Sequence, residues 1–299
     1  MSSTATIADH AAGPVALPPL TRIEHAHFRV SNLETAVAFY RDLVGMSVLS
    51  TDGKESVLSA SAAGAPVLYL TESAYAEPRN PRSPGLFHMA LLFPERRDLA
   101  LAFKRLYELR WPFQGFADHG VSEALYLADP DGNGIELYID RPRDAWPYRG
   151  GELQMVTEPL DVDSLLSEIS DRDSENPGSR PGPSIGHMHL QVSDLQKAEL
   201  FYHAILGFDI TQRNFPGALF MSAGGYHHHI GVNTWNSLGG PSTTPTARGL
   251  LSFALQLNDA RFTQVLRERM KGSEFWLRES ARGFVLRDGD SIQIEILNT

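Results

Sequence analysis

The chain has 299 residues, 42% of them hydrophobic and 21% charged, so it reads as an ordinary globular protein of about two domains. Its net charge of -10 repels phosphate backbones and argues against a nucleic-acid partner, and the absence of cysteine excludes disulfide scaffolds, thiolate nucleophiles and iron–sulfur clusters. No apolar run reaches the roughly 20 residues that span a bilayer, and the N-terminus lacks a basic-then-apolar leader. We therefore expect a soluble cytoplasmic protein.

The first predicted module follows residues 1–21, which are interpreted as a loose N-terminal tail. From His25 the sequence HAHFRVSNLETAVAFYRDLVGM predicts a strand and then an amphipathic helix. Ser31 and Asn32 are suitable N-cap residues, and Gly45 stands where a helix ends.

The second module begins at Gly85 with the predicted strand GLFHMALLF, followed by a charged helical stretch and the turn-and-strand sequence DPDGNGIELYI. Residues 141–183 then form a predicted linker rich in Pro, Gly, Ser and acidic residues. Within it, DVDSLLSEI predicts a short helix and SDRDSENPGSRPGPS a flexible loop.

The third module repeats the first: from His187, HMHLQVSDLQKAELFYHAILGF matches the segment from His25 without a gap, 162 residues apart. The fourth module, from Gly249, repeats the second more weakly, with GLLSFALQL and RDGDSIQIEI. The chain therefore holds four modules of strand, helix and further strands, beginning near residues 22, 85, 184 and 249.

These repeats, together with GYHHHIGVN from Gly225 and DPDGNGIE from Asp129, resemble the vicinal oxygen chelate superfamily, in particular type I extradiol dioxygenases of the bacterial catechol 2,3-dioxygenase branch. The resemblance implies an α+β fold of four βαβββ modules forming two open barrels. We expect a vicinal oxygen chelate domain at 22–140 (modules one and two) and another at 184–298 (modules three and four).

The same resemblance implies where a divalent metal would bind: the His of a module's first strand and a Glu of its last strand. In module two these are His88 and Glu136. In module four the matching positions are interpreted as Ser252 and Gln293, with Glu295 two residues further along. One metal site per chain is therefore expected.

The third ligand is either His187 of module three or His25 of module one. Acid–base groups are needed beside the metal, and module three carries the run His227–His229 where module one has only apolar residues. We therefore prefer His187, which pairs module two with module three in the active barrel and leaves modules one and four as a second barrel without metal. The rival pairing makes His25 the ligand.

The resemblance further implies His229 as the acid–base residue, with Tyr126 and His119 near the substrate oxygens. Alternation along a strand puts His228 on the face opposite His227 and His229, so His227 is the second residue of the run expected to contact substrate. Tyr126 is expected to donate a hydrogen bond to the developing oxyanion.

The implied activity is extradiol cleavage of a catechol or substituted catechol by O2, giving a 2-hydroxymuconate semialdehyde-type product. The implied cofactor is Fe(2+), and Mn(2+) accepts the same ligands. The partners are then a small aromatic diol and O2, with neither nucleic acid nor membrane, in a homo-oligomer. Two alternatives stay open: a glyoxalase-like metal-dependent lyase or isomerase, and a metal-free small-molecule binding protein of the same superfamily.

Overall fold

The computed structural model describes residues 16–170 and 181–298. Most of the predicted tail (1–15) and the centre of the predicted linker (171–180) lie outside the described residues. All four modules have the predicted order of one strand, one helix and three strands.

Modules one and two occupy the first half of the chain. Module one consists of β1 (Arg22–Val30), α1 (Leu33–Ala38) continued by the π-helical segment η1 (Phe39–Val44), β2 (Ser47–Asp52), β3 (Glu55–Ser59) and β4 (Pro66–Glu72). Module two consists of β5 (Gly85–Leu92), α2 (Arg96–Glu108), β6 (Phe113–Asp118), β7 (Ser122–Ala128) and β8 (Gly134–Asp140).

Modules three and four repeat this order. Module three consists of β11 (Ser184–Gln191), α4 (Leu195–Glu199) with the π-helical segment η4 (Leu200–Leu206), β12 (Asp209–Gln212), β13 (Ala218–Ser222) and β14 (Ile230–Asn233). Module four consists of β15 (Gly249–Gln256), α5 (Ala260–Met270), β16 (Trp276–Ser280), β17 (Gly283–Arg287) and β18 (Gln293–Leu297).

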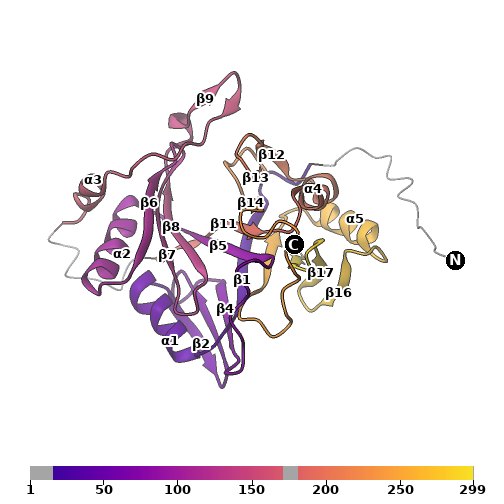
Figure 1. Cartoon of the computed structure of the whole chain (residues 1–299), viewed down its shortest axis with the longest axis horizontal. Helices are drawn as coiled ribbons and strands as arrows, with labels where there is room; N and C mark the ends of the chain where they lie inside the picture. Colours follow the sequence, from indigo (N-terminus) through magenta and orange to yellow (C-terminus); the bar gives the residue numbers. More distant parts are fainter. Residues whose placement is uncertain (1–15, 171–180, 299) are drawn as a thin grey trace.

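The strands form two open eight-stranded sheets, each built from two modules that are not consecutive in the chain (Figure 1). The first sheet has the order β16-β17-β18-β15-β1-β4-β3-β2 and joins modules four and one. The second sheet has the order β12-β13-β14-β11-β5-β8-β7-β6 and joins modules three and two, the preferred pairing. Each half of the chain thus contributes one module to each sheet. The division into domains at 22–140 and 184–298 stays a prediction.

The helices begin and end where their local sequence dictates. The side chain of Asn32 accepts a hydrogen bond from the Thr35 amide at 2.8 Å, and Asp194 accepts one from Gln196 at the same distance. Gly45 and Gly207 end the two π-helical segments with φ of 95° and 98°, the left-handed region that glycine adopts without strain.

A turn that contains a buried aspartate, Asp129 or Asp288, precedes the last strand of modules two and four. The Asp129 carboxylate accepts backbone N–H groups within its own loop, and the hydroxyl of Tyr40 donates to it at 2.9 Å. Tyr202 donates in the same way to Asp288, at 3.0 Å. Each tyrosine lies on the helical segment of one module and its aspartate in a turn of the next module, which contributes to the other sheet. These bonds therefore tie the two sheets together within each half of the chain.

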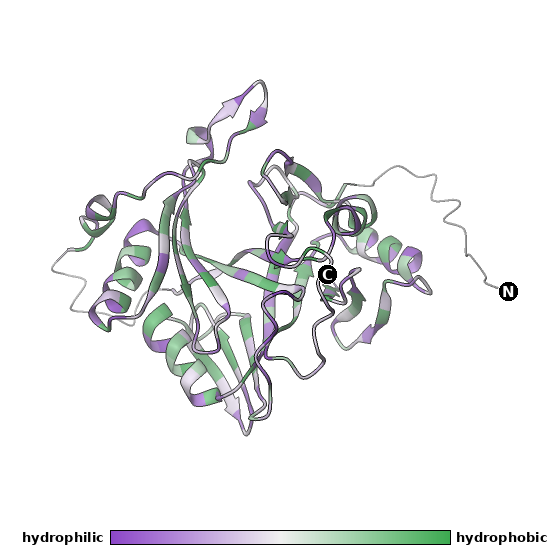
Figure 2. Cartoon of the chain, in the orientation of Figure 1, coloured by the Kyte–Doolittle hydropathy of each residue, from purple (hydrophilic) through white to green (hydrophobic). Residues whose placement is uncertain are grey.

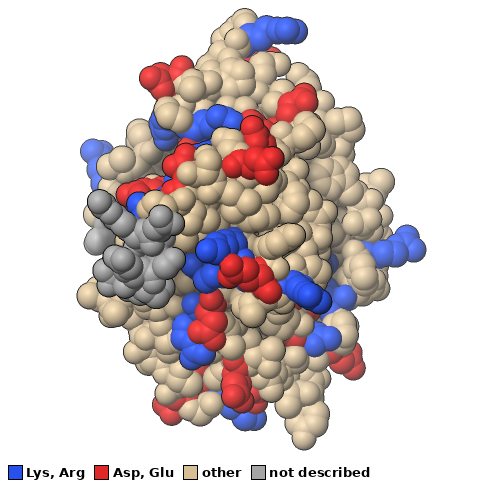
Figure 3. All heavy atoms as spheres, turned by 90° about the vertical axis from the view of Figure 1, so that its left-hand side faces the viewer, with Lys and Arg blue, Asp and Glu red and all other residues tan. Residues whose placement is uncertain are grey.

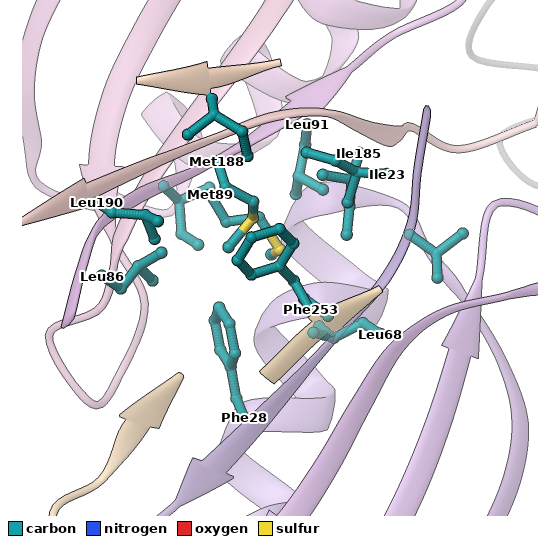
Figure 4. Packing of buried hydrophobic residues seen from close by; sticks show 14 of the residues in the cluster. Ile23, Phe28, Leu68, Leu86, Met89, Leu91, Ile185, Met188, Leu190 and Phe253 are labelled. Atoms are coloured by element: carbon teal, nitrogen blue, oxygen red, sulfur yellow. The ribbon is translucent and has the colours of Figure 1, made fainter. Parts of the chain in front are cut away.

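The hydrophobic core lies between the sheets and under the helices (Figure 2). Buried side chains from the central strands of both sheets meet there, among them Phe28 and Phe253 of the first sheet and Met89 and Met188 of the second (Figure 4). Since successive strand residues point to opposite faces, His187 and His189 are directed away from this core.

The connection between the halves carries η2 (Arg143–Ala145), the short hairpin β9 (Tyr148–Arg149) and β10 (Glu152–Leu153), and α3 (Val162–Leu166), the predicted short helix. The hairpin projects from the body of the molecule (Figure 1). On the face near α2 and α3, acidic and basic side chains are interspersed (Figure 3), and Arg96 pairs there with Glu123 and Glu168. Within the described ranges, no helix has the length and apolar character needed to cross a membrane.

Candidate metal centre

Three buried side chains converge on the second sheet: His88 of β5, Glu136 of β8 and His187 of β11. Glu136 Oε2 lies 2.9 Å from His88 Nε2 and 3.1 Å from His187 Nε2, and the two imidazole nitrogens are 3.3 Å apart. In the described part of the chain this is the group of His, Asp and Glu donors able to hold a metal ion. Two imidazoles and one carboxylate are the donor set of non-heme iron oxygenases, so the residues present fit a divalent metal.

The strand registers explain this convergence. β5 runs parallel to β8 with Ala90 opposite Glu136, and antiparallel to β11 with His187 opposite Ala90. A bulge in the β11–β5 pairing brings His88 opposite His189. The three donors therefore come from adjacent central strands, a rigid setting for a metal site.

The electrostatics of the cluster favour an ionised Glu136 carboxylate and a neutral His187 imidazole. Burial alone would raise the pKa of Glu136, but the imidazoles of His187 and His88 bring that pKa well below its usual range. Burial lowers the pKa of His187 to about 4, against the opposing charge of Glu136. Histidines bind a metal as neutral imidazoles, so the ligand set carries one negative charge, and a bound divalent cation would leave one net positive charge.

The cluster lies at the edge of a cavity of about 360 Å³. The cavity is walled mainly by aromatic and aliphatic side chains, with a few polar groups among them: Phe87, Phe116, Val156, Phe220, Trp235, His88, His119, Tyr126, Glu136, His189 and His228. Such a mainly apolar pocket with a few convergent polar groups suits a planar hydrophobic ligand with polar substituents at one end.

His119 and Tyr126, both expected near substrate, line this cavity and bond to each other. His119 Nδ1 lies 2.6 Å from the Val156 carbonyl, which can only accept, so this nitrogen carries the proton. His119 Nε2 is then the acceptor for the Tyr126 hydroxyl, 2.7 Å away. Burial, with the charge of Glu136, raises the pKa of Tyr126 well above its usual value, which keeps this hydroxyl protonated.

The histidine run contributes His228 to the cavity wall, where its ring centroid lies 4.0 Å from that of His187. His228 Nδ1 lies 2.8 Å from His227 Nδ1, and His227 Nε2 lies 2.9 Å from Asp140 Oδ1. Because the carboxylate accepts, His227 Nε2 carries the proton and His227 Nδ1 accepts from His228. His228 is thereby held with its proton on Nδ1 and a free lone pair on Nε2.

This placement differs from the assignment of His229 as acid–base residue and of His227 as a substrate contact. His229 Nδ1 accepts a hydrogen bond from the Ala223 amide at 3.2 Å, and its ring packs against Tyr226 instead of lining the cavity. His227 is fully buried behind His228. Alternation did separate His228 from its two neighbours, but β14 begins only at Ile230, so periodicity could not tell which face meets the cavity.

The register also corrects the interpretation of module four. Ala254 lies opposite Glu295 in the first sheet as Ala90 lies opposite Glu136 in the second, so Glu295, and not Gln293, occupies the Glu position. Asp288 and Asp129 each stand seven residues before their Glu, and this common spacing from the turn was the signal that would have aligned the two sequences. His25 Nε2 lies 3.6 Å from Glu295 Oε2, in the first sheet.

Two further residues, His189 and Asp140, support the site and were not predicted as site residues from the sequence. His189 lines the cavity, packs edge-on against His88, and bonds through Nε2 to the Asn233 amide at 3.0 Å. Asp140 is the last residue of β8, and its carboxylate contacts His227 Nε2. The two residues are distant in the chain, so no local sequence pattern predicts this contact.

Comparison with known proteins gives consistent matches. Residues 22–137 and 184–272 match the family model described as the Glyoxalase/Bleomycin resistance protein/Dioxygenase superfamily. The catechol-2,3-dioxygenase of Bacillus subtilis (strain 168) is 40% identical over 275 residues, covering 90% of this chain and 94% of that protein. The solved structure of a proposed dioxygenase from Bacillus subtilis aligns with a TM-score of 0.64 at 13% identity, covering 95% of this chain and 86% of that one. The solved structure of glyoxalase I from Zea mays aligns with a TM-score of 0.56 at 15% identity, covering 93% of this chain and 92% of that one.

Proposed function

Because the chain belongs to the glyoxalase, bleomycin resistance protein and dioxygenase superfamily, we propose that it is an extradiol ring-cleaving dioxygenase acting on a catechol or substituted catechol. The reaction breaks the ring C–C bond between one hydroxyl-bearing carbon and its unsubstituted neighbour, adds one atom of O2 to each of these two carbons, and gives a 2-hydroxymuconate semialdehyde-type product. The observation that carries the proposal is the convergence of His88, Glu136 and His187 beside an apolar cavity that also holds His228 and Tyr126.

In this proposal His88, Glu136 and His187 hold the metal. Fe(2+) is the preferred ion and Mn(2+) the alternative, since both accept two imidazoles and a carboxylate. When bound, the ion supplies the positive charge that stabilises an ionised diol and the electron transfer that O2 needs. A monoanionic catecholate brings one negative charge, which balances the single positive charge left by a divalent ion on Glu136.

His228 takes the acid–base role in place of His229. Burial, together with the neighbouring imidazoles, lowers the pKa of His228 well below its ordinary value, so the ring is neutral at pH 7 and accepts a substrate proton. The bond to His227, itself oriented by Asp140, keeps the lone pair on Nε2 for this purpose. The protonated ring is then the acid that returns the proton later in the cycle.

Tyr126 and His119 are two further polar groups in the cavity wall. When the diol binds, the Tyr126 hydroxyl can turn its single proton from His119 Nε2, 2.7 Å away in this structure, to the substrate oxygen on which negative charge develops. The aromatic walls, among them Phe87, Phe220 and Trp235, exclude water and hold the ring of the diol.

Metal analysis and oxygen uptake test the proposal. The purified protein, loaded anaerobically with Fe(2+) or with Mn(2+), is mixed with catechol and with 3- and 4-substituted catechols in air-saturated buffer. We expect O2 uptake together with a yellow product, only with metal present. A metal-loaded protein that consumes no O2 with any of these diols contradicts the proposal and favours a metal-dependent isomerase or a binding protein. Cytoplasmic location and a homo-oligomer are part of the same proposal, testable by fractionation and by light scattering.

A further inference from the structure

The first sheet contains a second cavity, of about 250 Å³, at the position that matches the metal centre of the second sheet. Its lining is mostly polar and includes His25, Tyr69, Ser252, Arg278, Arg282 and Glu295. His25 pairs with Ala254 across β1 and β15 as His187 pairs with Ala90, and Ala254 pairs with Glu295. Two of the three donor positions are therefore filled as in the metal centre.

The third donor position has changed. Ser252 lies opposite His27 in the first sheet where His88 lies opposite His189 in the second. A neutral serine hydroxyl is a weak ligand for a divalent transition metal, so His25 and Glu295 are left as an incomplete set. The Glu295 carboxylate is also engaged: Ser280 donates to Oε1 at 2.5 Å.

Two guanidinium groups border this cavity, and the metal-centre cavity has none. Arg282 donates to the Tyr69 hydroxyl at 3.3 Å and Arg278 to the side chain of Gln293 at 3.2 Å; both arginines are exposed, so their remaining N–H groups are accessible to a ligand. The two arginines and Glu295 together leave one net positive charge at the cavity. This charge disfavours a cation and favours a monoanion.

We propose that this second cavity binds a small organic monocarboxylate. Its carboxylate meets the forks of Arg278 and Arg282, since a guanidinium offers paired N–H groups that match a carboxylate. Its other end lies toward Ser252 and His25, which offer hydrogen-bonding groups at the buried end. The size of the cavity limits the ligand to about one ring or a short chain.

Calorimetric titration of the full-length metal-loaded protein with 4-hydroxybenzoate, and in parallel with its uncharged analogue 4-hydroxybenzamide, tests this site. We expect the carboxylate to bind at the second cavity and the amide to bind there at least about tenfold more weakly, because only the carboxylate pairs with the arginines. The double variant Arg278→Gln/Arg282→Gln should weaken carboxylate binding by at least about tenfold. Arg287→Gln, on the same strand β17 as Val285 of the cavity wall, is the matched control and should leave it unchanged.

A second variant, Ser252→Leu, fills the buried end of the cavity and should abolish carboxylate binding, and thermal melting checks that each variant is folded. Carboxylate binding that is the same in the wild type and the double arginine variant overturns the proposal, because the heat then comes from the apolar cavity of the second sheet. Equal affinity for acid and amide overturns it too. Stoichiometric Zn²⁺ binding that is lost in the variant Glu295→Gln also overturns the proposal, because the second cavity would then be a cation site. None of these measurements depends on oxygenase activity.

Discussion

The imidazoles of His227 and His228, adjacent in sequence, are hydrogen-bonded to each other through their Nδ1 atoms at 2.8 Å. One ring faces the cavity and the other faces the carboxylate of Asp140. This arrangement gives the two histidines different surroundings and leads to the first two predictions.

Replacing His228 with Gln is expected to lower kcat by about a hundredfold to ten-thousandfold, the usual worth of a positioned acid–base group. The matched variant His229→Gln removes a ring that packs on Tyr226 away from the cavity, and should keep kcat within a few-fold of the wild type. Steady-state oxygen uptake measures both, with melting temperature as the folding control. A normal kcat in His228→Gln with a collapse in His229→Gln would restore the assignment made from sequence.

Asp140→Asn should lower kcat by roughly tenfold to a hundredfold and leave KM nearly unchanged. The amide side chain of this variant can donate an N–H to His227 Nε2, so that His227 carries its proton on Nδ1 and donates to His228 Nδ1. His228 then carries its proton on Nε2 and has no lone pair there to accept a substrate proton. Since Asp140 does not line the cavity, the affinity for the diol is not expected to fall. A rise in KM at constant kcat would argue against this positioning role.

The variants His187→Ala and His25→Ala form a matched pair for the metal, because the two residues occupy equivalent positions in the two sheets. His187→Ala should lose bound metal, with a Kd raised by at least about a hundredfold, and His25→Ala should retain one ion per chain. Atomic absorption after gel filtration gives the stoichiometry. Loss of metal in the His25 variant alone would place the metal centre in the first sheet.

Tyr126→Phe should lower kcat by about tenfold to a hundredfold while the protein stays folded and metal-loaded. The substitution removes the hydroxyl that bonds to His119 at 2.7 Å and keeps the ring in the cavity wall. The comparison of kcat and metal content with the wild type separates this effect from damage to the neighbouring Glu136. An unchanged kcat would show that the hydroxyl takes no part in stabilising the substrate oxygen.

The metal-free protein should lose stability as the pH falls from about 6.5 to about 4. His187 accepts a proton near pH 4 in the folded state, against a normal value of 6.5, so the unfolded chain binds more protons in this window and acid favours unfolding. Thermal melting from pH 7 to pH 4 measures the slope, and His187→Gln should make it shallower. An identical slope in that variant would assign the acid sensitivity to other groups.

The four-module repeat, the N-caps at Asn32 and Asp194 and the helix-ending glycines were accessible from the sequence, because they depend on local periodicity and local backbone geometry. Placing His88 and Glu136 in one module was accessible for a related reason: the family resemblance ties both to fixed elements. The distances from His88 and Glu136 to His187 could not be predicted from the sequence. These distances depend on how β5 and β11 pair, and the two strands are almost 100 residues apart in the chain.

The tertiary structure decided three points. It determined which modules share a sheet, since backbone hydrogen bonds between β5 and β11 and between β1 and β15 join segments distant in the chain. It placed Glu295, and not Gln293, in register with Glu136, although the common seven-residue spacing from Asp288 and Asp129 was already present in the sequence. It also placed His228, and not His229, at the cavity wall, because the face of a loop residue that meets a cavity depends on how the loop enters its strand and not on the residue types it contains.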